Sequence, residues 1–156
     1  MTGKCQNLKF GFTAAATSAD TECSSDGERY AQMLTDCKLG FELGYDCAWV
    51  LEHHFTDYFP TPSPIVVMSH LAAAFPGLSL GSCVLVLPWY NPLRLAEEIS
   101  MLSHFCKGDL HLAFGRGTAK IEYDAYGIDM SSAKERFKEA IRIINQALLG
   151  EPFEFK

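Results

Sequence analysis

Short apolar runs recur along the chain, and each has the length and composition of a β-strand. They occupy residues 8–12, 47–51, 78–87 and 110–114. The run at 47–51 (CAWVL) is apolar throughout, as expected of a strand that is covered on both faces of a sheet. The pattern therefore predicts four strands.

Amphipathic or apolar stretches with helix-start signals follow each of these runs. Ser25 and Glu28 form a capping-box pattern, and the apolar positions behind them recur every three or four residues. Ser132 and Glu135 repeat the capping-box pattern before the last stretch. Residues 115–131, between the fourth expected strand and the last expected helix, are expected to form a polar loop. The four expected helices are 25–44, 64–75, 92–105 and 132–150.

The order of elements is strand–helix, repeated four times. Strands that alternate with helices of ten or more residues predict βαβ units and a parallel sheet. Right-handed crossovers leave an open doubly wound sheet or part of a (β/α)8 barrel. A closed barrel needs eight units and typically about 250 residues, so four units correspond to half of one.

The final residues, 151–156 (EPFEFK), resemble the start of another extended segment. We therefore expect residues 1–156 to be a single domain and the N-terminal part of a longer barrel. A four-stranded half-barrel leaves two sheet edges unpaired, and unpaired edges associate readily. Pairing with another copy or with a missing half is the expected consequence.

Composition and charge exclude several classes of protein. The 156 residues are 48% hydrophobic and 21% charged, which is typical of a folded globular chain and not of a disordered one. The net charge of −6, without any cluster of Lys or Arg, argues against nucleic acid and anionic membranes as partners. The longest apolar stretch is far shorter than the roughly 18 residues that cross a bilayer.

Six cysteines are present, but their spacing is irregular and no CxxC pair occurs. The first residues contain no apolar segment of the kind found in secretory signals. Several cysteines sit inside apolar runs, where cysteine packs as a small hydrophobic residue. The expectation is a cytoplasmic protein with reduced, buried thiols.

Glu52, His53 and His54 directly follow the second expected strand. The carboxyl ends of parallel strands hold the active sites of such folds, and histidine transfers protons near neutral pH. If the strand continues, alternation places Glu52 and His54 on one face and His53 on the other. A surface loop that happens to contain two histidines is the alternative. A metal site is not expected, because the HExxH pattern is absent and the other histidines lack ligand spacing.

Gly115, Arg116 and Gly117 follow the fourth expected strand in the same way. Flanking glycines let the backbone approach a ligand closely, and a guanidinium group suits a phosphate. The pattern is neither a dinucleotide fingerprint nor a P-loop, and no helix is expected to open there. A plain glycine turn with a solvent-exposed arginine is the alternative. Glu122, further along this loop, either lines the ligand site at the carboxyl ends of the strands or is a solvated carboxylate.

Small residues interrupt the third expected strand at 81–84 (GSCV). They indicate either a bulge, a flat ligand against the backbone, or tight packing of the core. Large aromatic side chains also gather near the strand ends, where they either wall an apolar pocket or belong to the core. These aromatic residues are Trp49, Phe55, Tyr58, Phe59, Trp89 and Tyr90.

Four motifs, in this order, resemble the bacterial luciferase-like flavin monooxygenases. The resemblance covers residues 8–150, nearly the whole chain, and four ordered motifs are more specific than any one of them. The motifs are 44–57 (GYDCAWVLEHHFTD), 86–88 (VLP) with 91–94 (NPLR) and 96–98 (AEE), 107–117, and 126–130 (YGIDM).

The resemblance implies the first four units of a (β/α)8 barrel and an oxygenase reaction. Reduced FMN, supplied by a separate reductase, would react with O2 and oxygenate a small organic substrate, an aldehyde in the luciferases. Related enzymes use the deazaflavin F420 for hydride transfer instead. A non-catalytic half-barrel that binds flavin or serves in assembly is a third reading, and a homo- or hetero-oligomer is expected.

The resemblance also assigns roles to residues. His53 matches the catalytic histidine beside the flavin ring, and His54 and Glu52 match its supporting neighbours. For the cofactor, the matching positions are Cys83 and Val84 against the isoalloxazine, Arg116 at the phosphate, Gly115 beside it, and Glu122 in the active-site loop. Luciferase α subunits carry cysteine where Gly115 stands, which points to a substrate other than theirs.

Overall fold

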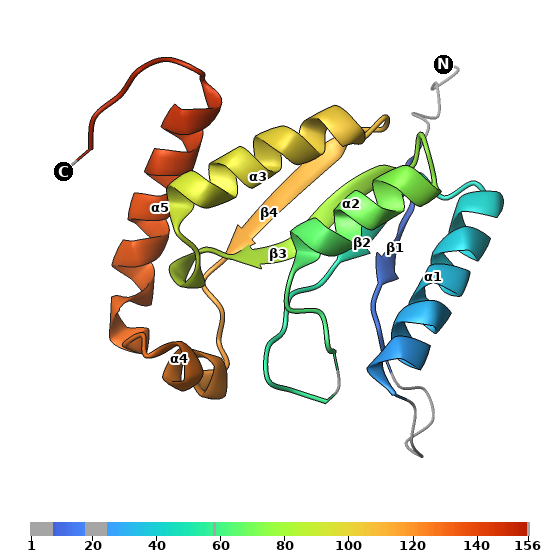
Figure 1. Cartoon of the computed structure of the whole chain (residues 1–156), viewed down its shortest axis with the longest axis horizontal. Coiled ribbons are helices and arrows are strands. Elements are labelled where there is room, and N and C mark those ends of the chain that lie inside the picture. Colours follow the sequence, from blue (N-terminus) through green and yellow to red (C-terminus); the bar gives the residue numbers. More distant parts are fainter. Residues whose placement is uncertain (1–7, 18–24, 58, 156) are drawn as a thin grey trace, which may run out of the picture.

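Four parallel strands form one sheet, in the order β1-β2-β3-β4 (Figure 1). The computed structural model describes residues 8–17, 25–57 and 59–155. Each strand pairs with the next along the chain, so all four carboxyl ends lie at one edge of the sheet. The predicted α/β organisation is confirmed. The strands are β1 (Gly11–Ala14), β2 (Cys47–Val50), β3 (Ser79–Val86) and β4 (Leu110–Gly115).

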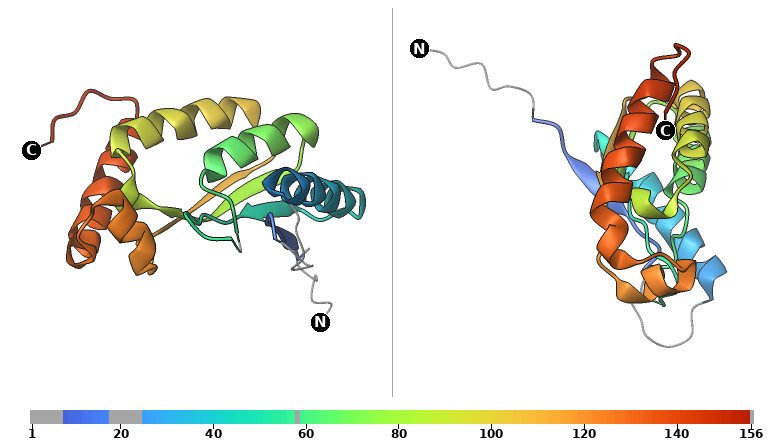
Figure 2. Two further views of the ribbon diagram at one scale, coloured as in Figure 1. Left: turned by 60° about the horizontal axis from the view of Figure 1, so that its bottom comes forward. Right: turned by 90° about the vertical axis from the view of Figure 1, so that its left-hand side faces the viewer.

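Helices flank the sheet and complete the strand–helix units. α1 packs on β1, α2 packs on β2 and β3, and α3 packs against both α2 and α5. α2 and α3 therefore lie side by side over one face of the sheet (Figure 2). The helices are α1 (Asp26–Glu42), α2 (Pro64–Ala74), α3 (Pro92–Phe105), α4 (Lys120–Tyr126) and α5 (Ala133–Leu148).

The hydrophobic core fills the space between the sheet and these helices. Ala48 and Val50 of β2 and Leu80 of β3 are fully buried, and they belong to one cluster with Met68 and Leu71 of α2. Removing this apolar area from water is the main force that holds the helices on the sheet. The side chains between these buried positions in β2 and β3 consequently point to the opposite face of the sheet, away from the helices.

Trp49 covers much of that other face. Its indole lies over Gly11 of β1 and Gly81 of β3, and a Cβ atom at either glycine would collide with the ring. The imidazole of His111, on β4, stacks against the same indole with ring centroids 5.8 Å apart. A single side chain from β2 thus spans three strands, which explains why two of its neighbours are glycine.

Two capping boxes were expected, and one of them is present. Ser25 caps α1 and exchanges hydrogen bonds with Glu28 as predicted. The second prediction is wrong, because Ser132 has helical backbone angles and its side chain makes no cap bond. An N-cap residue must be extended, and Ser132 already belongs to a 3-10 turn that Asp129 caps.

The first strand begins later than predicted. Residues 8–12 were expected to be extended, but pairing with β2 starts at Gly11, and Leu8 and Phe10 are exposed. The Asp46 side chain accepts the backbone N–H of Phe10 at 2.8 Å, and the backbone N–H of Asp46 donates to the Phe10 carbonyl. Apolar composition alone did not reveal which residues the neighbouring strand could pair.

The expected loop at 115–131 contains the short helix α4, so the prediction that no helix opens there is wrong. α4 has no side-chain cap at its start and only seven residues. Such a helix is not stable on its own, and tertiary contacts hold it. Tyr123 is fully buried and donates its hydroxyl hydrogen to the carbonyl of Arg116, while Glu122 is also buried.

The described cysteines are all free, as expected of reduced thiols, but they are not all buried. Burial is confirmed for Cys37 and Cys47, whereas Cys106 is half-buried. The prediction is wrong for Cys83, which is exposed because its strand face carries no helix. Cys5 and Cys23 lie outside the described residues.

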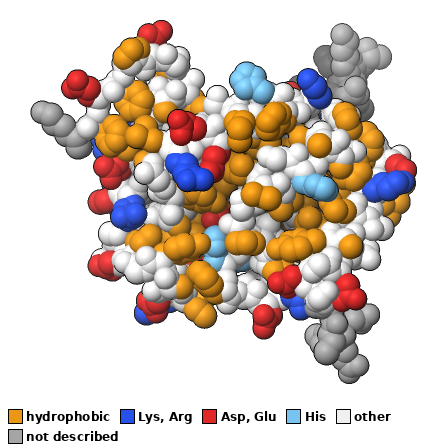
Figure 3. Space-filling view, viewed as in Figure 1, with side chains coloured by type: hydrophobic (Ala, Val, Ile, Leu, Met, Phe, Trp, Pro, Cys, Tyr) orange, Lys and Arg blue, Asp and Glu red, His pale blue; other side chains and the backbone are white. Residues whose placement is uncertain are grey.

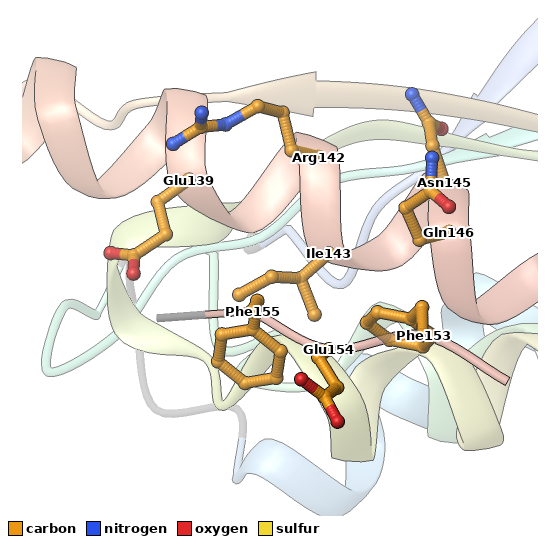
Figure 4. Close-up of a pocket in the computed structure, with 8 residues that line it drawn as sticks. All are labelled: Glu139, Arg142, Ile143, Asn145, Gln146, Phe153, Glu154 and Phe155. Atoms are coloured by element: carbon orange, nitrogen blue, oxygen red, sulfur yellow. The ribbon is translucent and has the colours of Figure 1, made fainter.

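Exposed apolar side chains occur on the helical side of the molecule (Figure 3). Val66 of α2 and Met101 and Phe105 of α3 are each more than half exposed. At the C-terminal end, Phe153 and Phe155 lie beside Ile143 of α5 (Figure 4). Within the described part of the chain, no helix is both long and apolar enough to cross a membrane.

Candidate active site

Glu52 and His54 form a buried pair just beyond the carboxyl end of β2. The Nε2 atom of His54 lies 3.0 Å from Oε1 of Glu52, and only 5% of Glu52 and 8% of His54 are exposed. The other carboxylate oxygen of Glu52 accepts the backbone N–H of Val86 at 3.0 Å. The pair therefore ties the tip of β2 to the tip of β3. Glu52 and His54 do meet, although β2 ends at Val50 and strand alternation does not extend to them.

Tyr90 adds a further donor to the Glu52 carboxylate. Burial, followed by the nearby Glu52 charge and a hydrogen bond to it, raises the pKa of the Tyr90 hydroxyl far above its usual value. The hydroxyl is therefore neutral and available as a donor. A buried carboxylate is stable only when its oxygens are hydrogen-bonded, and this one has donors from a strand, an imidazole and a phenol.

His53 points the other way and meets Glu122. Its Nδ1 atom lies 3.4 Å from Oε1 of Glu122, and its side chain is 32% exposed. Phe59 stacks against the imidazole with ring centroids 5.6 Å apart. The backbone N–H of His53 donates a hydrogen bond to the Thr61 carbonyl. His53 is thus held on several sides and is still accessible, the condition that a proton-transferring group requires.

Glu122 links the two histidines. It comes from α4, it is only 2% exposed, and its Oε1 accepts the backbone N–H of His54 at 2.9 Å. The reading of Glu122 as a solvated carboxylate is wrong. The loop after β2 and the helix after β4 therefore meet at the strand tips (Figure 1), and the same carboxylate oxygen faces His53.

Aromatic rings enclose His54. Trp89 and Tyr126 both meet its ring edge-on, at centroid distances of 5.0 and 5.2 Å, and Phe55 lies at 6.0 Å. The Tyr126 hydroxyl lies 2.8 Å from Nδ1 of His54. Part of the expected aromatic cluster is therefore present at the mouth, whereas Trp49 lies on the open face of the sheet and Tyr58 is outside the described residues.

The small residues of β3 form a bulge, as one of the readings of the sequence predicted. The register with β4 shifts between Ser82 and Leu85, and the Ser82 hydroxyl bonds to both the N–H and the carbonyl of Ala113. The peptide bond between Cys83 and Val84 is cis. The bulge leaves the Cys83 side chain exposed on the open face.

The two glycines that flank Arg116 pack against protein side chains. A Cβ atom at Gly115 would collide with the Val84 side chain, and Gly117 has a φ of +72° and lies against Val86 and Trp89. Their lack of a side chain is therefore already required by packing. Arg116 itself is exposed beyond the end of β4, at the same edge of the sheet as the histidines.

Tyr126 is the member of this site that received no role from the sequence. Residues four apart lie on the same side of a helix, so a helix over 120–126 would have placed Tyr126 beside Glu122. The signal was hidden because the segment was expected to be a loop. Among the described residues, no group of three potential metal ligands occurs.

Comparison with known proteins identifies the family. The model of the luciferase-like monooxygenase family matches residues 9–156. The chain belongs to that family. The alkanal monooxygenase alpha chain of Photorhabdus luminescens is 32% identical over 97 residues, which are 62% of this chain and 27% of that protein.

Two further relatives extend the comparison. The oxygenase component of the flavin-dependent trigonelline monooxygenase of Acinetobacter baylyi is 29% identical over 78% of this luciferase-like chain and 34% of its own length. The fold matches the oxygenating constituent of 3,6-diketocamphane monooxygenase from Pseudomonas putida, solved with FMN. The TM-score is 0.86 at 18% identity, over 96% of this chain and 41% of that one. The chain thus spans about a third of the curated relatives and carries about four units of the barrel fold.

Proposed function

We propose that this luciferase-like chain contributes the histidine side of the active site of a flavin-dependent monooxygenase. The reaction would use reduced FMN and O2 to oxygenate a small apolar organic substrate. The observation that carries the proposal is the placement of His53, accessible and held by the buried Glu122, at the same sheet edge as the exposed Arg116. Because the chain spans only part of its relatives, the activity of the whole protein is part of this proposal.

The donor set at this edge fits a flavin phosphate and ring. Arg116 offers a planar, permanently charged guanidinium group, which binds phosphate in a bidentate manner. The exposed face of β3 at Cys83 and Val84 is adjacent in the sheet, and it presents small or half-buried side chains instead of long polar ones. A flat aromatic ring requires such a surface.

Bound reduced flavin would supply the electrons that activate O2, and the protein would supply position and dryness. His53 would hold or move a proton at its imidazole nitrogens, and the Glu122 carboxylate, 3.4 Å from Nδ1, would orient the ring. Phe55, Trp89 and Tyr126 would exclude water from the mouth. The same apolar wall supports a substrate without charge, such as an aldehyde or a comparable apolar compound.

A separate reductase is the proposed source of reduced FMN. The support is the relative from Acinetobacter baylyi, which is named as an oxygenase component. We also propose that the chain works in a homo- or hetero-oligomer, because β1 and β4 are at the edges of the sheet.

Flavin binding is the first test. Binding to the protein should quench the fluorescence of FMN, and the quenching should saturate as protein is added. Arg116→Ala should weaken binding by roughly 10- to 100-fold, since charge-assisted hydrogen bonds are worth about 1.5–3 kcal/mol. Arg94→Ala, which removes an exposed arginine on α3, is the matched control. Absence of binding, or equal weakening by both variants, would contradict the proposal.

Oxygen consumption distinguishes the reactions that share this fold. The proposal requires consumption of O2 with substrate only when reduced FMN is supplied. Hydride transfer with F420 under anaerobic conditions, and none with FMN, would indicate the deazaflavin reaction instead. A stoichiometric FMN complex that never oxygenates any apolar substrate would indicate a storage or assembly role.

A further inference from the structure

We propose that Tyr126 is a positioning residue: its hydroxyl donates a hydrogen bond to Nδ1 of His54 and, together with Glu52 at Nε2, fixes the orientation of that ring. The inference deepens the proposed function, because it concerns the residue next to His53. It requires no flavin, however, and is tested without it.

The direction of each hydrogen bond follows from the chemistry of the partners. An ionised carboxylate only accepts, so the 3.0 Å contact between Oε1 of Glu52 and Nε2 of His54 requires hydrogen on that nitrogen. In a neutral imidazole the other nitrogen is then an acceptor. The Tyr126 hydroxyl, 2.8 Å from Nδ1, must be the donor there. The three groups form a chain with one polarity, from phenol to imidazole to carboxylate.

Two features keep Tyr126 in this role. Partial burial, and then the charges of Glu52 and Glu122, raise the pKa of its hydroxyl, so the phenol remains a neutral donor. The ring is also held between neighbours. Trp89 stacks on it with centroids 5.6 Å and planes 24° apart, and Phe55 lies at 5.6 Å on a tilted plane. The orientation of the hydroxyl is therefore largely set before any ligand binds.

The arrangement reaches His53 through Glu122. The backbone N–H of His54 holds Oε1 of Glu122 at 2.9 Å, and that oxygen faces Nδ1 of His53 at 3.4 Å. The ionisable groups that contact the His54 ring are Glu52 at Nε2 and Tyr126 at Nδ1, and Tyr90 acts through Glu52. Loss of the Tyr126 bond would leave the Glu52 contact alone to orient the His54 ring, in the segment whose backbone N–H holds Glu122.

Nitrogen resonances of the histidine rings provide the test. The chain has five histidines, and selective 15N-histidine labelling resolves them. At pH 8, above the usual titration range of histidine, the two nitrogens of His54 should give widely separated resonances, with the proton on Nε2. In Tyr126→Phe the Nδ1 resonance should move toward that of an imidazole nitrogen without a hydrogen-bond donor, because Nδ1 loses the phenol while Glu52 still holds the proton on Nε2.

Tyr123→Phe is the matched control, since it removes a hydroxyl from the same helix that bonds to the Arg116 carbonyl and not to His54. The His54 resonances should stay at their wild-type positions in this variant. Identical resonances in wild type and Tyr126→Phe, or a wild-type proton on Nδ1, would overturn the proposal.

A second measurement uses an unmutated sequence, in case Tyr126→Phe does not fold. Wild-type chain grown with 3-fluorotyrosine carries phenols that are stronger donors. The Nδ1 resonance of His54 should then shift further toward that of a hydrogen-bonded acceptor. His111, which stacks on Trp49, is the internal reference. An unchanged Nδ1 resonance of His54 would also overturn the proposal, whether or not the protein binds FMN.

Discussion

The backbone N–H of Val86 donates a 3.0 Å hydrogen bond to the buried carboxylate of Glu52, which joins the ends of two neighbouring strands. The bond makes Glu52 a structural group as well as a member of the candidate active site. Glu52→Ala leaves the Val86 N–H without its acceptor in a buried place. We expect the free energy of unfolding to fall by about 2–3 kcal/mol in urea titrations.

Glu97→Ala is the control for Glu52→Ala, because Glu97 is exposed on α3. It should change stability by no more than about 0.5 kcal/mol. Equal stability of the two variants would show that the Val86 bond and the His54 pair contribute nothing to folding.

Glu122 offers a way to separate charge from structure at the site. Glu122→Gln keeps an oxygen that accepts the His54 N–H but removes the negative charge beside His53. We expect turnover of the flavin-supplied reaction to fall at least about tenfold, with little change in urea midpoint.

His53→Ala should reduce turnover by about 10²–10⁴-fold, the usual contribution of a proton-transferring group. His104→Ala, an exposed histidine on α3, should leave turnover unchanged; wild-type turnover in His53→Ala would remove His53 from the reaction.

Gly81 tests the packing of Trp49 on the open face of the sheet. A methyl group at Gly81 would collide with the indole, so Gly81→Ala forces Trp49 to move and to lose its stacking on His111. Overpacking of this kind costs about 1–3 kcal/mol of unfolding free energy. The comparison is Gly27→Ala in the first turn of α1, where the new methyl group meets only a distant Ser25 oxygen. That change should be neutral or slightly stabilising.

Among the four described cysteines, Cys83 should have the most reactive thiol. It is exposed on β3, whereas burial raises the pKa of both Cys37 and Cys47 to about 11. With that value, only about one thiol in a thousand is ionised at pH 8, and the thiolate is the reactive form. Iodoacetamide followed by peptide mass spectrometry should therefore label Cys83 before Cys37, Cys47 and Cys106. If FMN lies against β3 as proposed, it should slow labelling of Cys83 and leave Cys106 unaffected.

The same two buried thiols predict alkaline instability. Their pKa values rise from 9.0 to about 11 on folding, so the unfolded chain releases these protons first as the pH increases. The contribution of these two thiols to the free energy of unfolding is fully present below pH 9 and should be lost between pH 9 and 11. Urea midpoints at pH 8, 9.5 and 10.5 measure the slope, and Cys37→Ala should make it shallower. A midpoint that is constant over this range would contradict the shift.

The amino-acid pattern was sufficient to predict a parallel α/β sheet and to propose where a site would lie. Apolar runs and capping signals predicted the parallel sheet, because burial of alternating faces and satisfaction of helix ends are local requirements. The position of Glu52, His53 and His54 after β2, and of Arg116 after β4, predicted one common edge, because parallel strands end on the same side. The resemblance to luciferase-like monooxygenases followed from the same segments, and the family match confirmed it.

Only the tertiary structure decided how these side chains pair. α4 exists because Glu122 and Tyr123 are buried against other segments, and a seven-residue helix has no local signal strong enough to reveal it. Tyr126 therefore had no visible role until α4 placed its hydroxyl beside His54, 72 positions away in the sequence. Such contacts depend on packing between distant segments, which hydrophobic periodicity does not encode. The same periodicity does indicate which stretches form strands or helices, because each has its own spacing of apolar residues.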